Sequence, residues 1–183
     1  MSPGPSFRHD HLTQILFKAL NPLRPHGFYV GMESSFYLNL PGKRKEVKPD
    51  VVVISMAGWQ QALKVEDKRD AQLCPLLPIE VRSPRNRPRE IIQKVHLYMK
   101  NGAMAVWLLE PQDGGIWVFS RASHPYMVKG RINTPYPLPQ YCLNIEATLR
   151  GEQTTAYKLN AGDPERLGEN RLWDRNRPIL WPR

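Results

Sequence analysis

Three ionisable residues in the middle of the chain have types and positions that suit phosphodiester chemistry. Asp50 comes immediately before the apolar run Val51–Ile54, and Glu80 lies inside an otherwise apolar segment. Lys94 lies on a predicted helix, at the margin of its apolar stripe, from which its ammonium group would reach a cleft. The stripe consists of Ile91, Ile92, Val95, Tyr98 and Met99. Two carboxylates can hold Mg²⁺, which prefers oxygen ligands, and a lysine can stabilise charge that develops on a phosphate. Together these residues predict metal-assisted phosphodiester hydrolysis.

Each of these residues also has a purely structural interpretation. Asp50 follows a proline and would form part of a turn. Lys94 would simply cover the edge of the core with its aliphatic stem. Strand alternation places Glu80 and Arg82 on one face, so Glu80 would pair with Arg82 or a lysine on an edge strand. A buried carboxylate is costly unless it is paired or binds a metal. For Glu80 alone the two interpretations have equal support, and the combination of three residues favours chemistry.

The elements that must position these residues follow from hydrophobic periodicity and turn signals. The predicted elements are a helix over Leu12–Leu20, a strand over Phe36–Leu40, a charged loop over Lys43–Lys48, strands over Val51–Ile54 and Leu76–Val81, a helix over Glu90–Lys100, strands over Ala105–Leu109 and Ile116–Phe119, and two weaker strands over Tyr126–Val128 and Tyr141–Ile145. Four consecutive β-branched residues, Val51–Ile54, indicate a strand that is covered on both faces. We therefore expect an α/β fold with a mixed central β-sheet flanked by helices.

The composition of the chain narrows the class of protein. The 183 residues carry 26 Lys and Arg against 17 Asp and Glu, and +6 of the net charge of +9 lies between Lys43 and Lys100. A basic surface favours polyanions such as nucleic acids. No apolar run approaches the roughly 18 residues of a membrane span, and the N-terminus lacks the apolar segment of a secretory signal. Cys74 and Cys142 have no cysteine neighbours. We expect no membrane association and a cytoplasmic location.

Several spaced motifs resemble the Uma family of restriction endonucleases, within the PD-(D/E)XK nuclease superfamily. The motifs are Ser2-Pro3 with His9-x-x-Leu12, Pro49-Asp50, Ile79-Glu80-Val81-Arg82-Ser83-Pro84, Lys94-x-x-x-Tyr98-x-x-x-Gly102, Val106-Trp107-Leu108-Leu109-Glu110-Pro111 and Leu138-Pro139-Gln140-Tyr141. The resemblance covers most of residues 1–150, which we treat as one nuclease-like domain. Residues 151–183 differ in composition and form a predicted C-terminal extension that wraps the domain, mediates association or is partly mobile.

The resemblance implies a restriction-endonuclease-like core in which Asp50 and Glu80 bind Mg²⁺ or Mn²⁺, with the backbone carbonyl of Val81 as a third ligand. The superfamily motif has a lysine two residues after the glutamate, and here that position holds Arg82. A guanidinium does not give up its proton, so it cannot act as a base. The resemblance therefore makes Lys94 the natural substitute, while Arg82 would contact phosphate.

The expected function is that of a divalent-metal-dependent endonuclease acting on DNA, with Arg85, Arg87 and Arg89 as a loop that contacts the DNA backbone. A homodimer would suit cleavage of both strands of a duplex. One alternative is a non-catalytic nucleic-acid-binding module on the same fold, and another is a structural or partner-binding protein that uses the C-terminal extension. His9-x-His11 lacks a third metal ligand, and Glu33 is better explained as an exposed edge residue.

Overall fold

The computed structural model describes residues 7–67, 69, 71–84, 86–121, 123–152 and 157–158. In chain order its elements are α1 (Phe7–Leu20), the 3₁₀ helix η1 (Asn21–His26), β1 (Phe28–Met32), β2 (Phe36–Leu40), β3 (Lys43–Val47), β4 (Val51–Ser55), α2 (Met56–Ala62), β5 (Leu77–Val81), α3 (Pro88–Lys100), β6 (Ala105–Glu110), β7 (Gly115–Ser120), β8 (Tyr126–Val128), β9 (Arg131–Asn133), β10 (Tyr141–Asn144), α4 (Ile145–Leu149) and β11 (Tyr157–Lys158).

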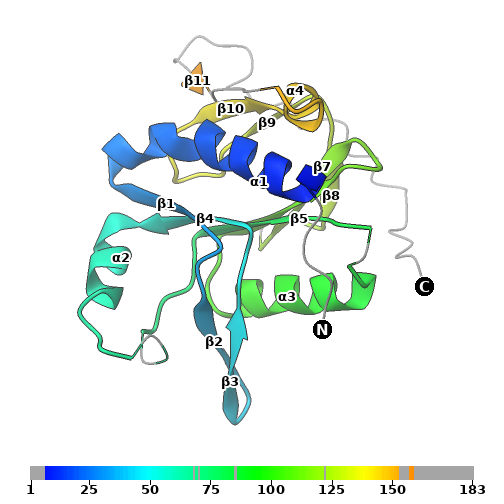
Figure 1. The fold of residues 1–183 in the computed structure, drawn as a ribbon. Helices are drawn as coiled ribbons and strands as arrows, with labels where there is room; N and C mark the ends of the chain where they lie inside the picture. The colour runs from blue at the N-terminus through cyan, green and yellow to red at the C-terminus, as the bar shows by residue number, and fades with distance from the viewer. Residues whose placement is uncertain are drawn as a thin grey trace.

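A six-stranded sheet with the order β1-β4-β5-β6-β7-β8 organises the molecule (Figure 1). Its neighbouring strands are antiparallel except for β5 and β6, which run parallel. A parallel pair requires a crossover connection, and α3 supplies it between these two strands. The prediction of an α/β fold with a mixed central sheet flanked by helices is confirmed.

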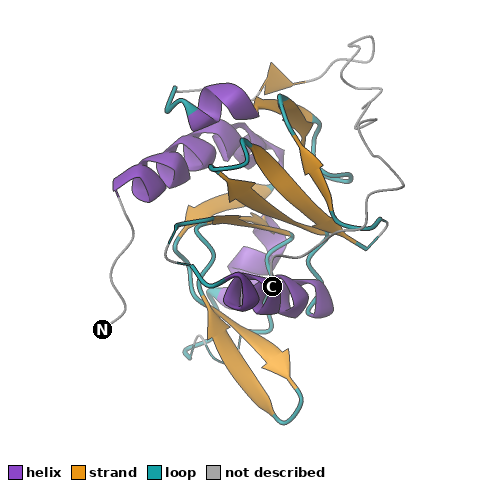
Figure 2. Cartoon of the chain, turned by 90° about the vertical axis from the view of Figure 1, so that its right-hand side faces the viewer, coloured by secondary structure: helices purple, strands orange, loops and turns teal. Residues whose placement is uncertain are grey.

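Helix α1 covers one face of this sheet and α3 covers the other, as Figure 1 and Figure 2 show from two directions. Strand β4 lies between β1 and β5, and its residues Val51–Ile54 are completely buried. Val51 and Val53 belong to the core on the α1 side, while Val52 and Ile54 belong to the core on the α3 side. The prediction of a strand covered on both faces is therefore confirmed.

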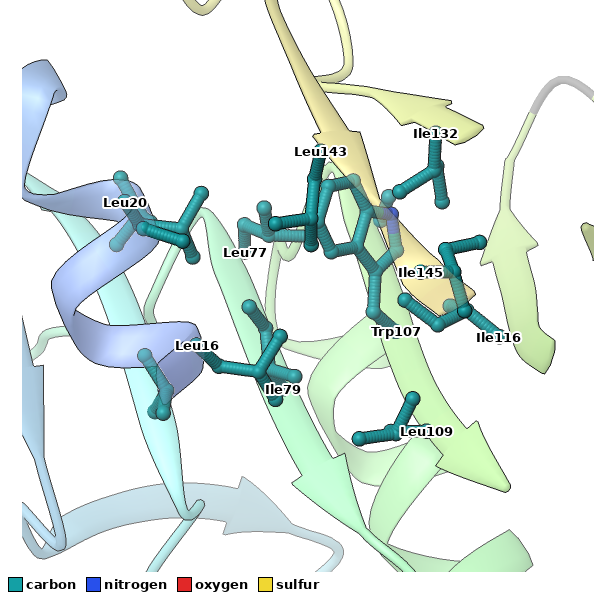
Figure 3. Close-up of a cluster of buried hydrophobic side chains, with 14 of the residues drawn as sticks. Leu16, Leu20, Leu77, Ile79, Trp107, Leu109, Ile116, Ile132, Leu143 and Ile145 are labelled. Atoms are coloured by element: carbon teal, nitrogen blue, oxygen red, sulfur yellow. The ribbon is translucent and has the colours of Figure 1, made fainter. Parts of the chain in front are cut away.

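The core on the α1 side joins the helix, the central sheet and a smaller sheet with the order β11-β10-β9. Figure 3 shows Leu16 of α1 beside Ile79 of β5 and Leu20 at the level of Leu77, with Trp107 of β6 close to Leu143 of β10. Trp107 is 1% exposed and belongs to the core of the sheet. This packing holds β5 and β6 firmly from one side and leaves the other face to α3.

The prediction of a charged loop over Lys43–Lys48 is wrong. Residues Lys43–Val47 form β3, which pairs with β2 as an antiparallel hairpin. In β3 only Val47 is buried, so the strand lacks the alternation of apolar residues that identifies a strand in a sequence. The hairpin, which we call the β2–β3 arm (Phe36–Val47), projects from the central sheet on the side of α3 (Figure 1).

The other elements differ less from their predicted boundaries. Asn21 ends α1 as predicted, but the chain continues directly into η1. The strand predicted over Tyr141–Ile145 stops at Asn144, because the Asn144 side chain accepts a hydrogen bond from the Ala147 amide and caps α4. Elements β1, α2, β9 and α4 had no separate prediction. Helix α3 begins at Pro88, whose fixed backbone angle suits the first turn of a helix.

Most of the predicted C-terminal extension, including Trp173 and Trp181, lies outside the described residues. Within it the structure describes Gly151, Glu152 and the short strand β11, which pairs with β10. None of the helices in the described part of the chain combines the length and hydrophobicity that crossing a bilayer requires.

Candidate active site

Antiparallel pairing brings the two predicted carboxylates to the same place. Val51 of β4 lies opposite Ile79 of β5, so one further step along each strand sets Asp50 opposite Glu80. The Asp50 carboxylate lies directly against β5, where its Oδ2 accepts a hydrogen bond of 2.6 Å from the Val81 amide. The strand register therefore joins two acidic residues that are thirty positions apart in the sequence.

Helix α3 supplies both hydrogen-bond donors to Glu80. Lys94 Nζ donates to Oε2 at 2.7 Å, and the hydroxyl of Tyr98 donates to Oε1 at 2.8 Å. Residues four apart lie on the same face of a helix, which is why both side chains reach the same carboxylate. Tyr98 is fully buried, whereas the Lys94 side chain is 34% exposed. Lys94 thus links a buried acid to the surface, as its place at the margin of the apolar stripe predicts.

The surroundings of the Glu80 carboxyl raise its pKa on balance. Burial raises the pKa of the Glu80 carboxyl, the positive charge of Lys94 acts in the opposite direction, and the charge of Asp50 raises that pKa further. Burial, together with the adjacent Glu80, also raises the pKa of Tyr98, so its hydroxyl keeps its proton and remains a donor. Two carboxylates and a buried phenol therefore share a site in which any additional positive charge would be stabilised.

His9 of α1 approaches Asp50 from the other side of the sheet. Its Nε2 lies 3.2 Å from Asp50 Oδ2, and its Nδ1 lies 3.3 Å from Asp10 Oδ1. The hydrogen bond with Asp50 raises the pKa of His9, against the opposing effect of burial. His11, in contrast, lies 3.2 Å from the Gly151 carbonyl oxygen. His9 and His11 do not converge on one point, and among the described residues no group of three His, Cys, Asp or Glu side chains could hold a metal ion.

Arg82 lies beside this site but makes a different ion pair. Its Nη1 donates to Glu110 Oε2 at 2.5 Å, and Glu110 lies at the end of the neighbouring strand β6. Arg82 and Glu110 line a pocket together with Arg8, His9 and Ser83. The Arg82 side chain is 30% exposed. A phosphate contact by Arg82 remains a prediction, and it would have to share this guanidinium with Glu110.

The remaining predicted residues lie around the beginning of α3. Arg87 is exposed and its Nη1 is 4.0 Å from Glu90 Oε1, while Arg89 is exposed in the first turn of the helix. Arg85 lies outside the described residues. Glu33 is exposed and accepts a 2.9 Å hydrogen bond from Lys48, which agrees with its interpretation as an edge residue. The arginines stay predictions as DNA contacts.

Three residues of this region were not predicted in these roles: Tyr98, His9 and Glu110. Tyr98 counted as a core residue of the helix stripe, although its spacing of four from Lys94 carries a signal for a shared partner. Glu110 lies just beyond the strand predicted over Ala105–Leu109, and its burial depends on a strand pairing that the sequence does not reveal. The contact of His9 with Asp50 joins two distant segments and has no local signal.

Comparison with known proteins identifies the family and the fold. The mixed sheet, with α3 as the crossover helix between its two parallel strands, is an α/β domain. Residues 1–145 match the Uma2 family, described as "Putative restriction endonuclease". The match covers most of the chain, and the chain belongs to this family. No significant match exists among curated proteins.

A solved structure supports the fold independently. The chain is similar to a crystal structure from Anabaena variabilis ATCC 29413, described as a "putative nuclease belonging to DUF820". The two share 18% sequence identity and a TM-score of 0.64, and the similarity covers 81% of this chain and 84% of the other. At this identity the likeness establishes the fold. Family and fold together indicate a restriction-endonuclease-like nuclease.

Proposed function

We propose that this protein is a divalent-metal-dependent endonuclease that hydrolyses phosphodiester bonds in DNA. The observation that carries the proposal is the meeting of Asp50 and Glu80 across β4 and β5, with Lys94 donating to Glu80 at 2.7 Å. Placing a second carboxylate beside a buried one costs free energy, because two negative charges repel each other. This electrostatic cost is explained if Asp50 and Glu80 together hold a cation.

The residues present fit Mg²⁺ or Mn²⁺. The oxygen donors would be the carboxylates of Asp50 and Glu80 and the backbone carbonyl of Val81, a set that suits hard divalent cations. The Asp50 charge raises the pKa of the buried Glu80, and a cation at this point would offset the repulsion that causes this shift. When bound, such an ion supplies Lewis-acid chemistry and neutralises charge on the scissile phosphate.

The chain's own residues would hold and orient the reacting groups. The Val81 amide and His9 fix the position of the Asp50 carboxylate, and Tyr98 fixes one oxygen of Glu80. Lys94 lies at the surface end of the site, where its ammonium group would stabilise the negative charge that develops on the phosphate oxygens. Tyr98, which is buried and protonated, acts as a positioning residue and stays away from the DNA.

The test combines metal binding with cleavage. Wild type, Asp50→Asn and Glu80→Gln are incubated with supercoiled plasmid and Mg²⁺ or Mn²⁺, and binding of the metal alone is measured by calorimetry. Loss of one ligand is expected to reduce cleavage about a hundredfold or more and to weaken metal binding. Asp113→Asn, which removes an exposed carboxylate from the turn between β6 and β7, is the matched control. Cleavage that persists in both ligand variants would exclude this site.

One observation favours a second function, that of a non-catalytic DNA-binding module. Both oxygens of Glu80 already accept hydrogen bonds, from Lys94 and from Tyr98. In a module without metal these bonds would simply satisfy a buried acid. Wild-type protein that binds DNA, but takes up neither Mg²⁺ nor Mn²⁺ in the presence of that DNA, would establish this alternative.

A further inference from the structure

The β2–β3 arm is an exposed, positively charged ribbon beside the candidate site. Strand β3 begins with Lys43, Arg44 and Lys45, and all three side chains are exposed. Only Glu46 opposes them within the strand, so the five residues of β3 carry a net charge of +2. Arg44 also donates to the backbone carbonyl of Arg69, so the segment that follows α2 lies against the outer half of the arm.

The base of the arm is fixed to the domain, so the ribbon is held in place by tertiary contacts. Phe36, Leu38 and Val47 belong to the hydrophobic core on the α3 side. Asn101, at the end of α3, binds the backbone of Asn39 twice: its Oδ1 accepts from the Asn39 amide at 2.8 Å, and its Nδ2 donates to the Asn39 carbonyl at 3.1 Å. A two-stranded hairpin is marginal by itself, and these contacts stabilise it.

The arm is also connected directly to the candidate site. Strand β3 ends at Val47, and only Lys48 and Pro49 separate it from Asp50. The arm projects on the side of the sheet that α3 covers (Figure 1), and Glu80 faces α3 as well. A polyanion that lies along this side of the molecule would contact the arm and the carboxylates together.

We infer that the β2–β3 arm binds duplex DNA and positions it over the Asp50–Glu80 site, an inference that rests on the proposed nuclease function. A five-residue strand spans about 17 Å at roughly 3.3 Å per residue. The major groove of DNA is about 12 Å wide and 8.5 Å deep and accepts a two-stranded β-ribbon. The cations of β3 would neutralise phosphates at the borders of the groove.

The competing explanation is protection of a free strand edge. Strand β3 pairs only with β2 in the described part of the chain, and lysines on an edge strand discourage unwanted pairing with other molecules. The two explanations make different predictions. Protection predicts self-association after the charges are removed, whereas DNA binding predicts a weaker complex and a weaker dependence of its affinity on salt.

The experiment compares three full-length proteins: wild type, the arm variant Lys43→Gln/Arg44→Gln/Lys45→Gln, and a control variant. The control, Lys18→Gln/Lys64→Gln/Lys129→Gln, removes the same charge from exposed positions outside the arm. Fluorescence anisotropy with a labelled 20-base-pair duplex, and with its single strand, gives the affinity over a series of salt concentrations. EDTA is present throughout, so that binding is measured without cleavage.

The arm variant is expected to bind the duplex about tenfold or more weakly, and the slope of log affinity against log salt should decrease by about 2.7, or 0.9 for each lost phosphate contact. The control should change the slope by less than one. An arm variant that binds the duplex like the control overturns the inference, and so does an equal loss for duplex and single strand. Self-association with unchanged DNA affinity would establish edge protection instead.

A measurement on unaltered protein avoids any dependence on the folding of the variants. Surface lysines of wild type are acetylated with and without the duplex, and the modified positions are read by mass spectrometry. Lys43 and Lys45 should be protected by the duplex, while Lys18 and Lys129 should react equally in both samples. No protection of the arm overturns the inference even if plasmid cleavage is robust. Protection without cleavage would support DNA binding by the arm and would remove the proposed catalytic function.

Discussion

The central sheet carries two buried carboxylate–cation pairs of the same form, one on β5 and one on β6. Glu80 accepts from Lys94 at 2.7 Å, and Glu110 accepts from Arg82 at 2.5 Å. The two glutamate side chains are 7% and 2% exposed, while their cationic partners are 34% and 30% exposed. The geometry of the ion pair does not by itself distinguish a catalytic acid from a structural one.

The neighbours of each glutamate make the difference. Opposite Glu80 lies Asp50, which adds a second negative charge. Opposite Glu110 on β7 lies Gly115, which has no side chain. Arg82 is permanently charged and suits a lasting ion pair, whereas the more compact ammonium of Lys94 can exchange partners. Because only Glu80 has a second carboxylate beside it, we propose Glu80–Lys94 as the functional pair and Arg82–Glu110 as the structural pair.

The largest expected contrast comes from neutralising each glutamate in turn. Glu110→Gln leaves Arg82 with a weaker acceptor, and we expect a loss of about 2 kcal/mol in the free energy of unfolding, below the usual cost of breaking a buried pair because Arg82 reaches solvent. Cleavage per folded molecule should remain near that of wild type. Urea unfolding and plasmid cleavage on the same samples measure both quantities.

Glu80→Gln is the matched variant and should behave in the opposite way, with cleavage lost and the fold retained. The comparison fails if Glu110→Gln abolishes cleavage while the protein stays folded. In that event Arg82 and Glu110 would belong to the catalytic machinery, and the pocket they line with His9 would be part of the active site.

The functional pair was easier to predict from the sequence than the structural pair. Glu80 interrupts an apolar strand, and alternation correctly separates it from Ile79 and Val81, which pack in the core on the α1 side. Lys94 follows from helix periodicity. Both signals are local, and Asp50 was singled out by its place immediately before the apolar run Val51–Ile54. Glu110 is buried because β6 pairs in parallel with β5 across a long connection, and this register has no counterpart in the local pattern.

The β2–β3 arm and the contact between α1 and Asp50 were also not predicted from the sequence, because both depend on how separate segments pair and pack. Strand β3 is defined by backbone pairing with β2 rather than by buried side chains, so its charged residues resemble a loop. His9 meets Asp50 only after the sheet and α1 have packed together. Local periodicity predicts elements and faces, whereas contacts between distant segments depend on the whole fold.

A smaller effect tests the hydrogen bond that Tyr98 contributes to the functional pair. Tyr98→Phe removes the donor to Glu80 Oε1 without changing the packing of the ring. A hydrogen bond to a charged acceptor is worth about 1.5–3 kcal/mol and one to a neutral acceptor about 1 kcal/mol. At pH 8 the substitution should therefore cost about 1 kcal/mol more in wild type than in Glu80→Gln. Equal costs in both backgrounds would show that Tyr98 does not stabilise a charged Glu80.

The finest distinction between the two pairs is a dependence of stability on pH. Burial and Asp50 raise the pKa of Glu80 above its ordinary value of 4.5. A carboxyl with a raised pKa in the folded state contributes stability below its unfolded pKa, and this contribution is lost as the pH rises through the folded pKa. The stability of wild type relative to Glu80→Gln, measured by urea unfolding in EDTA, should therefore fall as the pH rises from about 4.5 and then level off. In an Asp50→Asn background the fall should end at a lower pH, because one cause of the raised pKa is gone. A difference that is flat, or that grows in favour of wild type with rising pH, would show that Lys94 fully compensates the buried charge, and Glu80 would then resemble Glu110.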